Sequence, residues 1–361
     1  MSVSSREKSS EKLPPKKVGI PRALYYHKFF PFWVELLQRM GCEIILSPET
    51  DPAIVDMGSE FCTSEFCPPM RIYYGHVQYL LKNYPDLDYL FIPRYASLDK
   101  NHYSCPHFMA LPDSVKHVIK PPVPILEWEI NTKKMTNIES VIELGKIFGI
   151  EKNKAGEIFV LALNDFRRFG SFIRKKKILF PKAVYRNYKK ILKSSKPKKI
   201  KNSGDGNSEV KKLNILVLGH PYNLYEPLLN DNLIEWLQEH EIKITSIDSV
   251  PKDVFKERVT LSMKFKNYYG SEEELLQAAR HYLIDAQDEV DGVIFVTSTA
   301  CVCDSLIRDL LKRNFIKIKK PFLTVVLDGS FKYVEQTDKF GESQIIASVE
   351  TFVNKIRGQK S

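Results

Sequence analysis

Cysteines are the residues of this sequence with the clearest capacity for chemistry. By the strand and helix pattern described below, Cys67 opens a helix after a loop, Cys105 follows an apolar strand at some remove, and Cys301 directly follows another strand. Ligands of open α/β sheets gather at the carboxyl ends of strands. At a helix N-terminus, unpaired N–H groups and the helix dipole stabilise the thiolate, which is the form that binds metal. The three cysteines are therefore candidates for one metal site.

The spacing of the cysteines leaves a second interpretation open. The sequence has no C-x-x-C pair; Cys62 and Cys67 are five residues apart, and Cys301 and Cys303 are two apart. Both Cys301 and Cys303 could serve one site only if their loop bends suitably. Each cysteine could instead be a small buried apolar residue. For Cys42, which leads an apolar strand, we prefer that interpretation.

Three histidines are further candidates for this chemistry. His76 shares the predicted helix of Cys67, His107 follows Cys105 by two residues, and His220 lies in the loop GHPYN. Most such histidines are hydrogen-bonded structural residues, so metal ligation by any of them stays open. The sequence contains neither G-x-x-x-x-G-K-[ST] nor G-x-G-x-x-G. If ATP matters to this protein, a partner is expected to hydrolyse it.

Strand and helix patterns alternate in two stretches of the chain. The first contains strands at residues 17–24, 42–46, 88–93 and 124–129, with helices at 29–40 and 67–81. The second contains strands at 213–218, 242–247, 292–296 and 322–328, with helices at 226–239, 272–285, 304–313 and 344–356. The strand at 88–93 is apolar without alternation, as expected where helices cover both faces of a sheet. This alternation predicts an α/β fold with mainly parallel sheets.

The same pattern predicts how the chain is organised. With 361 residues, two domains are favoured over one continuous core. Residues 1–16 form a polar tail without the apolar stretch of a secretory signal. Residues 17–131 form the first α/β domain and 132–192 a helical connector. Residues 193–212 (KSSKPKKIKNSGDGNSEVKK) read as a flexible basic linker, and 213–361 as the second α/β domain with a C-terminal helix.

Charge and composition limit the classes of function. The net charge is +10, but residues 174–201 alone contain thirteen Lys or Arg and no acidic residue. This segment is predicted to be a solvated helix face and linker, so nucleic-acid binding is the least favoured function. No apolar run approaches the roughly 20 residues needed to cross a bilayer. We therefore expect a cytoplasmic protein, in which six cysteines argue against a disulfide framework.

Several segments together resemble a family of proteins related to 2-hydroxyacyl-CoA dehydratases and their activases. Members of this family are called acyl-CoA dehydratase activase-related or CoA-substrate-specific enzyme activase-related proteins. The matches extend from about residue 17 to 356 and are poorest between 132 and 212. The matching segments are VGIPRALYYHKFFPFW (18–33), CPPMRIYYGHVQYL (67–80), YLFIPRYASL (89–98), CPHFMALPD (105–113), LGHPYNLYEPLLNDNLI (218–234), DGVIFVTSTACVCDSL (291–306) and GESQIIASVETFV (341–353).

The resemblance implies two Rossmann-like halves facing a central cleft that holds a [4Fe–4S] cluster, with larger iron–sulfur clusters known among relatives. The positions that match the cysteine motifs of the family are Cys67, Cys105 and Cys301. Three thiolates on a four-iron cluster would leave one iron free for another ligand. The loop TACVC at 299–303 departs from the more usual Gly-Pro pair, and its extra Cys303 is a candidate fourth ligand. The segment 329–339 also departs from the family pattern.

The resemblance leads to two hypotheses about function. In the first, the cluster accepts a low-potential electron from an ATP-hydrolysing activase and passes it to a small substrate, such as a 2-hydroxyacyl-CoA thioester, at the open iron. His76, His220, Tyr222 and Asn223 would then line the cleft, and the chain would act as a lyase or reductase, as a homodimer or heterodimer. In the second, the same fold is an accessory or assembly subunit that carries a cluster without turnover.

Overall fold

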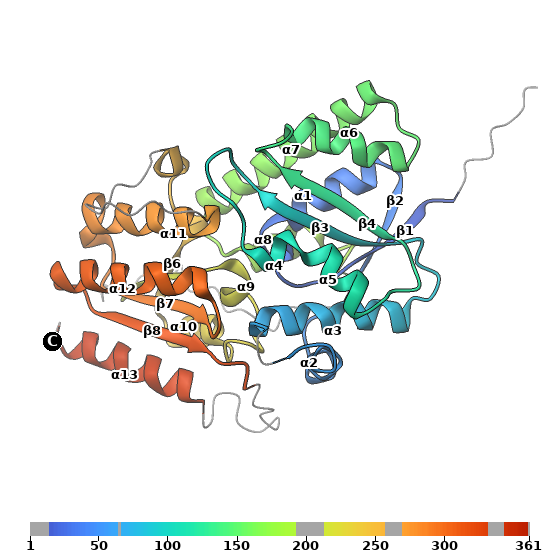
Figure 1. The fold of residues 1–361 in the computed structure, drawn as a ribbon. Coiled ribbons are helices and arrows are strands. Elements are labelled where there is room, and N and C mark those ends of the chain that lie inside the picture. Colours follow the sequence, from blue (N-terminus) through green and yellow to red (C-terminus); the bar gives the residue numbers. More distant parts are fainter. Residues whose placement is uncertain (1–13, 64–65, 193–212, 257–268, 331–342, 360–361) are drawn as a thin grey trace, which may run out of the picture.

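The computed structural model of the protein describes residues 14–63, 66–192, 213–256, 269–330 and 343–359. In this part of the chain the strands form two four-stranded sheets, with strand orders β2-β1-β3-β4 and β6-β5-β7-β8. All strand pairs are parallel, and helices lie between successive strands (Figure 1). The predicted α/β class with two Rossmann-like parallel sheets is therefore confirmed. No helix in the described ranges is long and apolar enough to span a membrane.

The first sheet and its helices occupy the N-terminal half of the chain, and a helical stretch follows them. In chain order, the elements are β1 (Lys16–Ile20), α1 (Tyr26–Arg39), β2 (Cys42–Leu46), α2 (Pro52–Ser59), α3 (Pro68–Asn83), β3 (Tyr89–Ser97), α4 (Pro106–Met109), α5 (Leu111–Val118), β4 (Ile125–Asn131), α6 (Asn137–Ile147), α7 (Lys152–Lys176) and α8 (Phe180–Tyr188). In Figure 1, α1 and α7 lie on one side of this sheet, and α3 and α5 lie on the other.

The second sheet repeats the arrangement. Its elements are β5 (Asn214–Gly219), α9 (Pro221–Leu224), α10 (Leu233–Glu239), β6 (Lys243–Ser246), the short helices η1 (Ile247–Ser249) and η2 (Lys252–Lys256), α11 (Gly270–Arg280), the π-turn η3 (His281–Asp285), η4 (Gln287–Glu289), β7 (Gly292–Ser298), α12 (Val302–Lys317), β8 (Phe322–Leu327) and α13 (Gln344–Gly358). Helices α11 and α12 pack on one face of this sheet, and α10 and α13 on the other.

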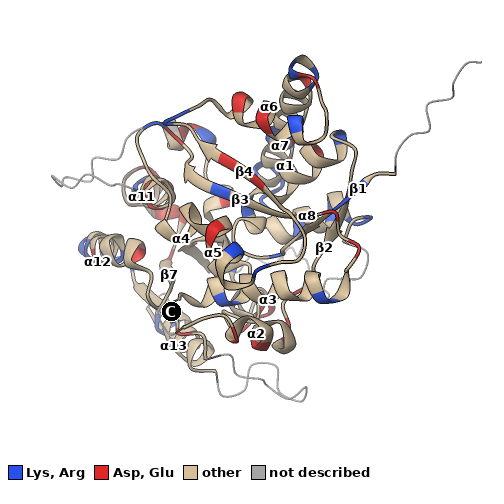
Figure 2. Cartoon of the chain, turned by 45° about the vertical axis from the view of Figure 1, so that its right-hand side comes forward, with Lys and Arg blue, Asp and Glu red and all other residues tan. Residues whose placement is uncertain are grey.

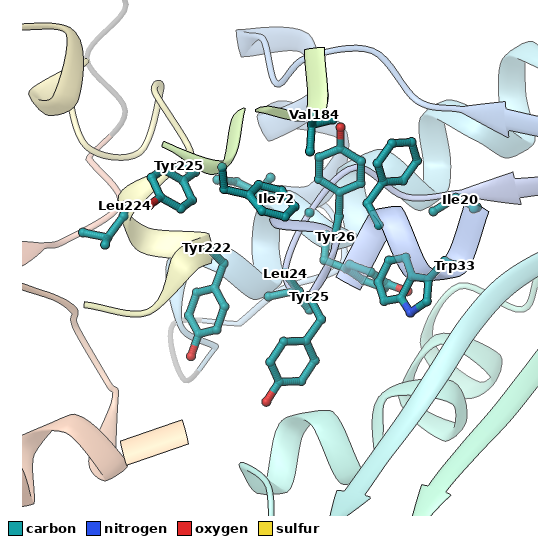
Figure 3. Packing of buried hydrophobic residues seen from close by; sticks show 14 of the residues in the cluster. Ile20, Leu24, Tyr25, Tyr26, Trp33, Ile72, Val184, Tyr222, Leu224 and Tyr225 are labelled. Carbon is teal, nitrogen blue, oxygen red and sulfur yellow. The ribbon is translucent and has the colours of Figure 1, made fainter. Parts of the chain in front are cut away.

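The hydrophobic core differs from the expected pair of separate cores. One cluster of buried residues runs from the first sheet into the α10 and α13 face of the second sheet. Aromatic contacts continue it across the two halves: Phe180 of α8 stacks on Tyr225, and the rings of Tyr25 and Tyr222 lie 6.5 Å apart (Figure 3). A second cluster lies under α11 and α12. The halves are thus joined by apolar packing as well as by the chain, because α8 and α9 bury their apolar side chains against α1.

Polar contacts also join the two halves. Tyr103 forms an isolated parallel bridge with Tyr269, and the Gly270 N–H donates a hydrogen bond to the Tyr103 carbonyl at 3.0 Å. Lys28 of α1 is ion-paired with Glu274 of α11. These contacts hold the segment before Cys105 against the start of α11, which brings two distant parts of the chain to one place.

Two predicted helices have different limits in the structure. The helix expected at 226–239 is only α10, because Asp231 and Asn232 adopt left-handed conformations (φ 52° and 57°) that no regular helix contains. The helix expected at 272–285 ends as α11 at Arg280 and continues as a π-turn. Apolar spacing at helical intervals persists through both breaks, so the sequence pattern did not reveal them. The predicted tail (1–16) lies mostly, and the linker (193–212) entirely, outside the described residues.

The described part of the basic segment contains the end of α7 and the whole of α8. In it, α8 buries Phe180, Ala183 and Val184, while most of the Lys and Arg side chains are exposed. Basic and acidic residues are interspersed over the elements in the view of Figure 2. Within the described residues, the structure therefore supports the interpretation of this charge as a solvated helix face.

Candidate metal centre

Cys67, Cys105 and His220 share one local structure. They are the N-cap residues of α3, α4 and α9, and a proline follows each of them. Their backbone angles are extended, with φ/ψ of −64°/149°, −54°/137° and −65°/143°. A proline disfavours the helical conformation in the residue before it and fits the first turn of a helix. The local sequence therefore places each thiol or imidazole beside the unpaired N–H groups of a helix start.

Cys301 reaches the same kind of position by a different local structure. It is the N-cap of α12, and the residue before it, Ala300, has a left-handed backbone (φ 60°). This conformation costs a residue with a Cβ atom roughly 1–2 kcal/mol. Leu24, directly before Tyr25 in the loop after β1, is also left-handed (φ 52°). Strained backbone thus precedes two residues that meet at the site, as is common at functional sites.

The fold brings four of the six cysteines together. Cys67 is close enough to Cys105 and Cys301 for their negative charges to raise its pKa. The Cys105 and Cys303 thiols, from the two halves of the molecule, lie close enough for each to shift the pKa of the other. Because 38 and 196 residues separate Cys67, Cys105 and Cys301 in sequence, only the tertiary structure can produce this convergence.

The four thiols differ in pKa. Burial raises the pKa of Cys67 to about 12, and it also raises the pKa of Cys301. The interaction between the neighbouring thiols of Cys105 and Cys303 lowers the pKa of Cys105 and raises that of Cys303. Backbone N–H groups in the first helical turns favour each thiolate, those of Met70, His107 and Asp304 for Cys67, Cys105 and Cys301 respectively. Metal binding would therefore displace protons from thiols that are otherwise neutral.

A buried histidine and two buried carboxylates complete the site. His220 Nε2 lies 2.9 Å from Asp304 Oδ1 and 3.3 Å from Glu272 Oε1, and all three side chains are at most 3% exposed. One ligand atom each from His220, Cys301 and Asp304 lies within 4.8 Å of the other two. Asp304 is oriented by Thr297, whose hydroxyl donates a hydrogen bond to Oδ2 at 2.7 Å.

The charged forms of His220 and Asp304 stabilise each other. Burial by itself lowers the pKa of His220, but the Asp304 carboxylate outweighs it, so the pKa of His220 is raised well above its usual range. Burial likewise acts to raise the pKa of Asp304, and the imidazolium of His220 reverses this and lowers it. The metal-free site therefore holds an imidazolium beside an ionised carboxylate.

Of the other predicted cleft residues, Tyr222 lies at the site and Asn223 has a structural contact. The Tyr222 ring stacks on His220 with 5.0 Å between centroids, and its hydroxyl points the same way as that of Tyr25 (Figure 3). Asn223 is fully buried, and its Oδ1 accepts a hydrogen bond from Ser298 Oγ at 2.7 Å, which ties α9 to the end of β7. The role of these residues in binding a substrate stays a prediction.

His76 lies in a different environment. It is fully buried on α3, its Nε2 is 3.0 Å from Thr50 Oγ1, and the nearest charged groups that affect it are Arg22 and His27. Burial, with smaller contributions from Arg22 and His27, lowers the pKa of His76 to about 3. The contacts of the described residues therefore assign His76 to the packing of α3, apart from the thiols.

This environment predicts that acid destabilises the fold through His76. An unfolded histidine titrates near its ordinary pKa of about 6.5, whereas folded His76 does so near 3. The contribution of His76 to stability is thus complete above pH 6.5 and is lost at about 1.4 kcal/mol per pH unit as the pH falls toward 3. Between pH 6.5 and 5, the free energy of unfolding of the wild type should fall about 2 kcal/mol more than that of His76→Asn, as measured in urea. The exposed His117→Asn is the control and should keep the wild-type slope; equal slopes for His76→Asn and wild type would contradict the expectation.

The sequence did not single out Asp304, Glu272 or Tyr25. Asp304 lies three residues after Cys301, in the first turn of α12, and Glu272 is in the first turn of α11. Both positions are typical of acidic residues that favour a helix N-terminus, so they carried no distinctive signal. For His220 a signal existed: like Cys67 and Cys105, it directly precedes a proline, and it follows the strand predicted at 213–218.

The two remaining cysteines lie elsewhere. Cys42 begins β2 and is buried in the hydrophobic core, which confirms the expectation for it. Cys62 is partly buried after α2, and burial raises its pKa to about 12. Neither interacts with the other four thiols in the contacts of the described residues. They provide natural controls for experiments on the site.

Fold and site together define a class: an α/β protein with two parallel sheets and a buried thiol–imidazole–carboxylate centre built from helix N-termini of both halves. Residues 17–250, more than half of the chain, match the family described as the CoA enzyme activase uncharacterised domain (DUF2229). The chain therefore belongs to this family. The matched region contains Cys67, Cys105 and His220, and the residues from α11 and α12 lie beyond it. No curated protein matches the chain.

Proposed function

We propose that this protein is an iron–sulfur redox protein whose cluster is held by Cys67, Cys105 and Cys301, with Cys303 as a candidate fourth ligand. The observation that carries the proposal is the convergence of cysteines from distant loops, three of them at helix N-termini. The donor set fits the group, because iron–sulfur clusters are held by cysteine thiolates and hydrogen bonds to sulfur tune them. When bound, a [4Fe–4S] cluster, or a larger one, would carry a low-potential electron and leave an iron open to a substrate.

The residues around the thiols are suited to binding and orienting a small acyl substrate. His220 brings a positive charge to the site, and Asp304 and Glu272 hold its ring in place. Burial raises the pKa of Tyr222 well above its usual range, so its hydroxyl stays neutral and can donate a hydrogen bond. We propose that these two groups orient a carbonyl such as that of a CoA thioester.

The family description points to the source of the electron. The family is named for the activase of CoA enzymes, and the sequence lacks the glycine-rich phosphate loops of ATP-binding proteins. We propose that a separate ATP-hydrolysing activase docks on this protein, itself a homodimer or heterodimer, and reduces the cluster. A thiol-ligated centre of this kind needs a reducing compartment, so the proposal includes a cytoplasmic location.

Anaerobic purification of the full chain tests the proposal. We expect iron and acid-labile sulfide in the ratio of a cluster, and an electron paramagnetic resonance signal after reduction. Addition of a 2-hydroxyacyl-CoA thioester should change this signal, whereas free CoA should change it less. A cluster signal that no acyl-CoA alters would favour the accessory or assembly function. Absence of both iron and sulfide after reconstitution would refute the cluster.

A further inference from the structure

The histidine and carboxylate beside the thiols have an unusual mutual geometry. His220 Nε2 and Asp304 Oδ1 are only 2.9 Å apart, yet neither atom has a hydrogen-bond partner among the described residues. A hydrogen bond requires alignment as well as distance, and weakens steeply when the angle is poor. Once His220 releases its Nε2 proton, the lone pairs of this nitrogen and of Asp304 Oδ1 are both available to a third partner. Ligands of a common metal ion have this geometry.

Burial makes such an arrangement costly without a cation. Asp304, Glu272 and His220 are almost completely excluded from solvent, and the Cys301 thiol lies beside them. Buried carboxylates are tolerated only when they are paired, hydrogen-bonded or bound to a metal. Thr297 and Ser271 donate hydrogen bonds to Asp304 Oδ2 and Glu272 Oε2, which leaves Asp304 Oδ1 and His220 Nε2 without a hydrogen bond among the described residues. A divalent ion would balance the charge of the group more completely.

The atoms also match the ligand preferences of particular metals. One ligand atom each from His220, Cys301 and Asp304 lies within 4.8 Å of the other two, a spread that a single ion can span. Mixed imidazole, thiolate and carboxylate ligands suit zinc and ferrous iron and are unsuited to magnesium or calcium. Glu272 Oε1 lies 3.3 Å from His220 Nε2 but does not belong to this group of three, so it is a neighbouring carboxylate.

We propose that His220, Cys301 and Asp304 bind a single divalent ion of the zinc or ferrous type, with Glu272 as a neighbouring carboxylate. The three ligands come from the second half of the chain, from the loop after β5 and the start of α12. The cluster, in contrast, requires Cys67 and Cys105 of the first half. Because Cys301 belongs to both ligand sets, the ion and the cluster are alternative occupants of that thiolate, and the ion site is complete in a chain that carries no cluster.

The probe for this site is Co²⁺, added anaerobically to the full-length protein after removal of iron and sulfide. Binding should be one ion per chain, with a thiolate-to-cobalt charge-transfer band. Zn²⁺ should displace Co²⁺ and abolish the band, whereas Mg²⁺ should not. If the wild type binds no Co²⁺ in the site, the proposal fails.

Two groups of variants separate the ion site from the cluster. His220→Gln and Asp304→Asn should each weaken Co²⁺ binding roughly 100- to 1,000-fold, the share of one ligand in a typical four-ligand zinc site. Cys67→Ser and Cys105→Ser should leave it unchanged, and the matched histidine control His76→Asn should also bind Co²⁺ normally. If Cys67→Ser and Cys105→Ser weaken Co²⁺ binding as much as His220→Gln does, the ion lies among the thiols and the proposal is wrong.

X-ray absorption of the wild type with bound Zn²⁺ keeps the proposal testable if a variant does not fold. We expect one sulfur ligand together with nitrogen and oxygen ligands, including imidazole. A shell of three or four sulfurs would overturn the proposal. If only the proposal of a cluster is wrong, the protein should contain no iron or sulfide and should still bind Co²⁺ through His220.

Discussion

Replacing Cys67, Cys105 or Cys301 by serine should remove most of the iron that the protein binds. In the proposed cluster each replacement deletes a thiolate ligand, and loss of even an outer-shell partner of a metal site costs on the order of 10- to 100-fold in affinity. We therefore expect at least about a 100-fold loss for a ligand. The measurement is iron and sulfide per chain after identical anaerobic reconstitution, with circular dichroism to check the fold. Cys303→Ser decides whether the fourth thiol is a ligand.

The chain supplies two matched controls for this experiment. Cys62→Ser lies five residues before Cys67, near the same helix start, and should keep its iron. Cys42→Ser places a hydroxyl in the core beneath β2 and should reduce stability while iron content stays unchanged. Equal iron loss from Cys62→Ser and Cys67→Ser would show that general damage, and not ligation, explains the result. Full iron content in all three ligand variants would refute the shared cluster.

Gly75→Ala should destabilise the whole fold, because α2 and α3 cross at a backbone contact. A Cβ atom on Gly75 would lie 1.9 Å from the carbonyl oxygen of Ile54, and one on Gly58 would lie 1.9 Å from that of Arg71. Backbone atoms cannot move aside as the end of a side chain can. Overpacking of a core costs about 1–3 kcal/mol and occasionally more, and here we expect the upper end, about 3 kcal/mol or more. The measurement is the free energy of unfolding in urea.

Gly156→Ala is the control for this prediction. Gly156 lies within α7, and the nearest atom to its added Cβ would be Ile138 Cδ1 at an ordinary 3.6 Å. Alanine should stabilise the helix there by up to about 1 kcal/mol. Because α3 begins directly after Cys67, Gly75→Ala should also lower iron content, which Gly156→Ala should not. An unchanged unfolding midpoint for Gly75→Ala would mean that α2 and α3 do not cross as closely as described.

The elements of the fold were largely predictable because their signals are local. The apolar run at 88–93 identified β3, although pairing with β4 extends that strand to Ser97. Helix ends were less predictable where the backbone leaves the helical region without a proline or glycine. Asp231 and Asn232 adopt left-handed backbone angles and interrupt the helix that the apolar spacing predicts at 226–239. The core cluster that spans both sheets was also unexpected, since the packing of α8 and α9 on α1 involves residues far apart in sequence.

The site was predictable in part. For Cys67 and Cys105, the following proline sets the extended backbone of an N-cap, so their position at a helix start is a local property. His220 has the same local signal, and only its environment distinguishes it from a structural histidine. His76 shows the opposite case: it shares a helix with the residues after Cys67, yet helical rotation directs it to Thr50.

The sequence by itself determined the parallel α/β class, the cysteine positions at helix starts and the resemblance to CoA enzyme activase-related proteins. These follow from strand and helix periodicity and from dipeptides that act over a few residues. The tertiary structure alone decided that Cys303 meets Cys105, and that Asp304 and Glu272 enclose His220. Such contacts join segments up to about two hundred residues apart, and they exist only because parallel strands direct their following loops to one end of each sheet.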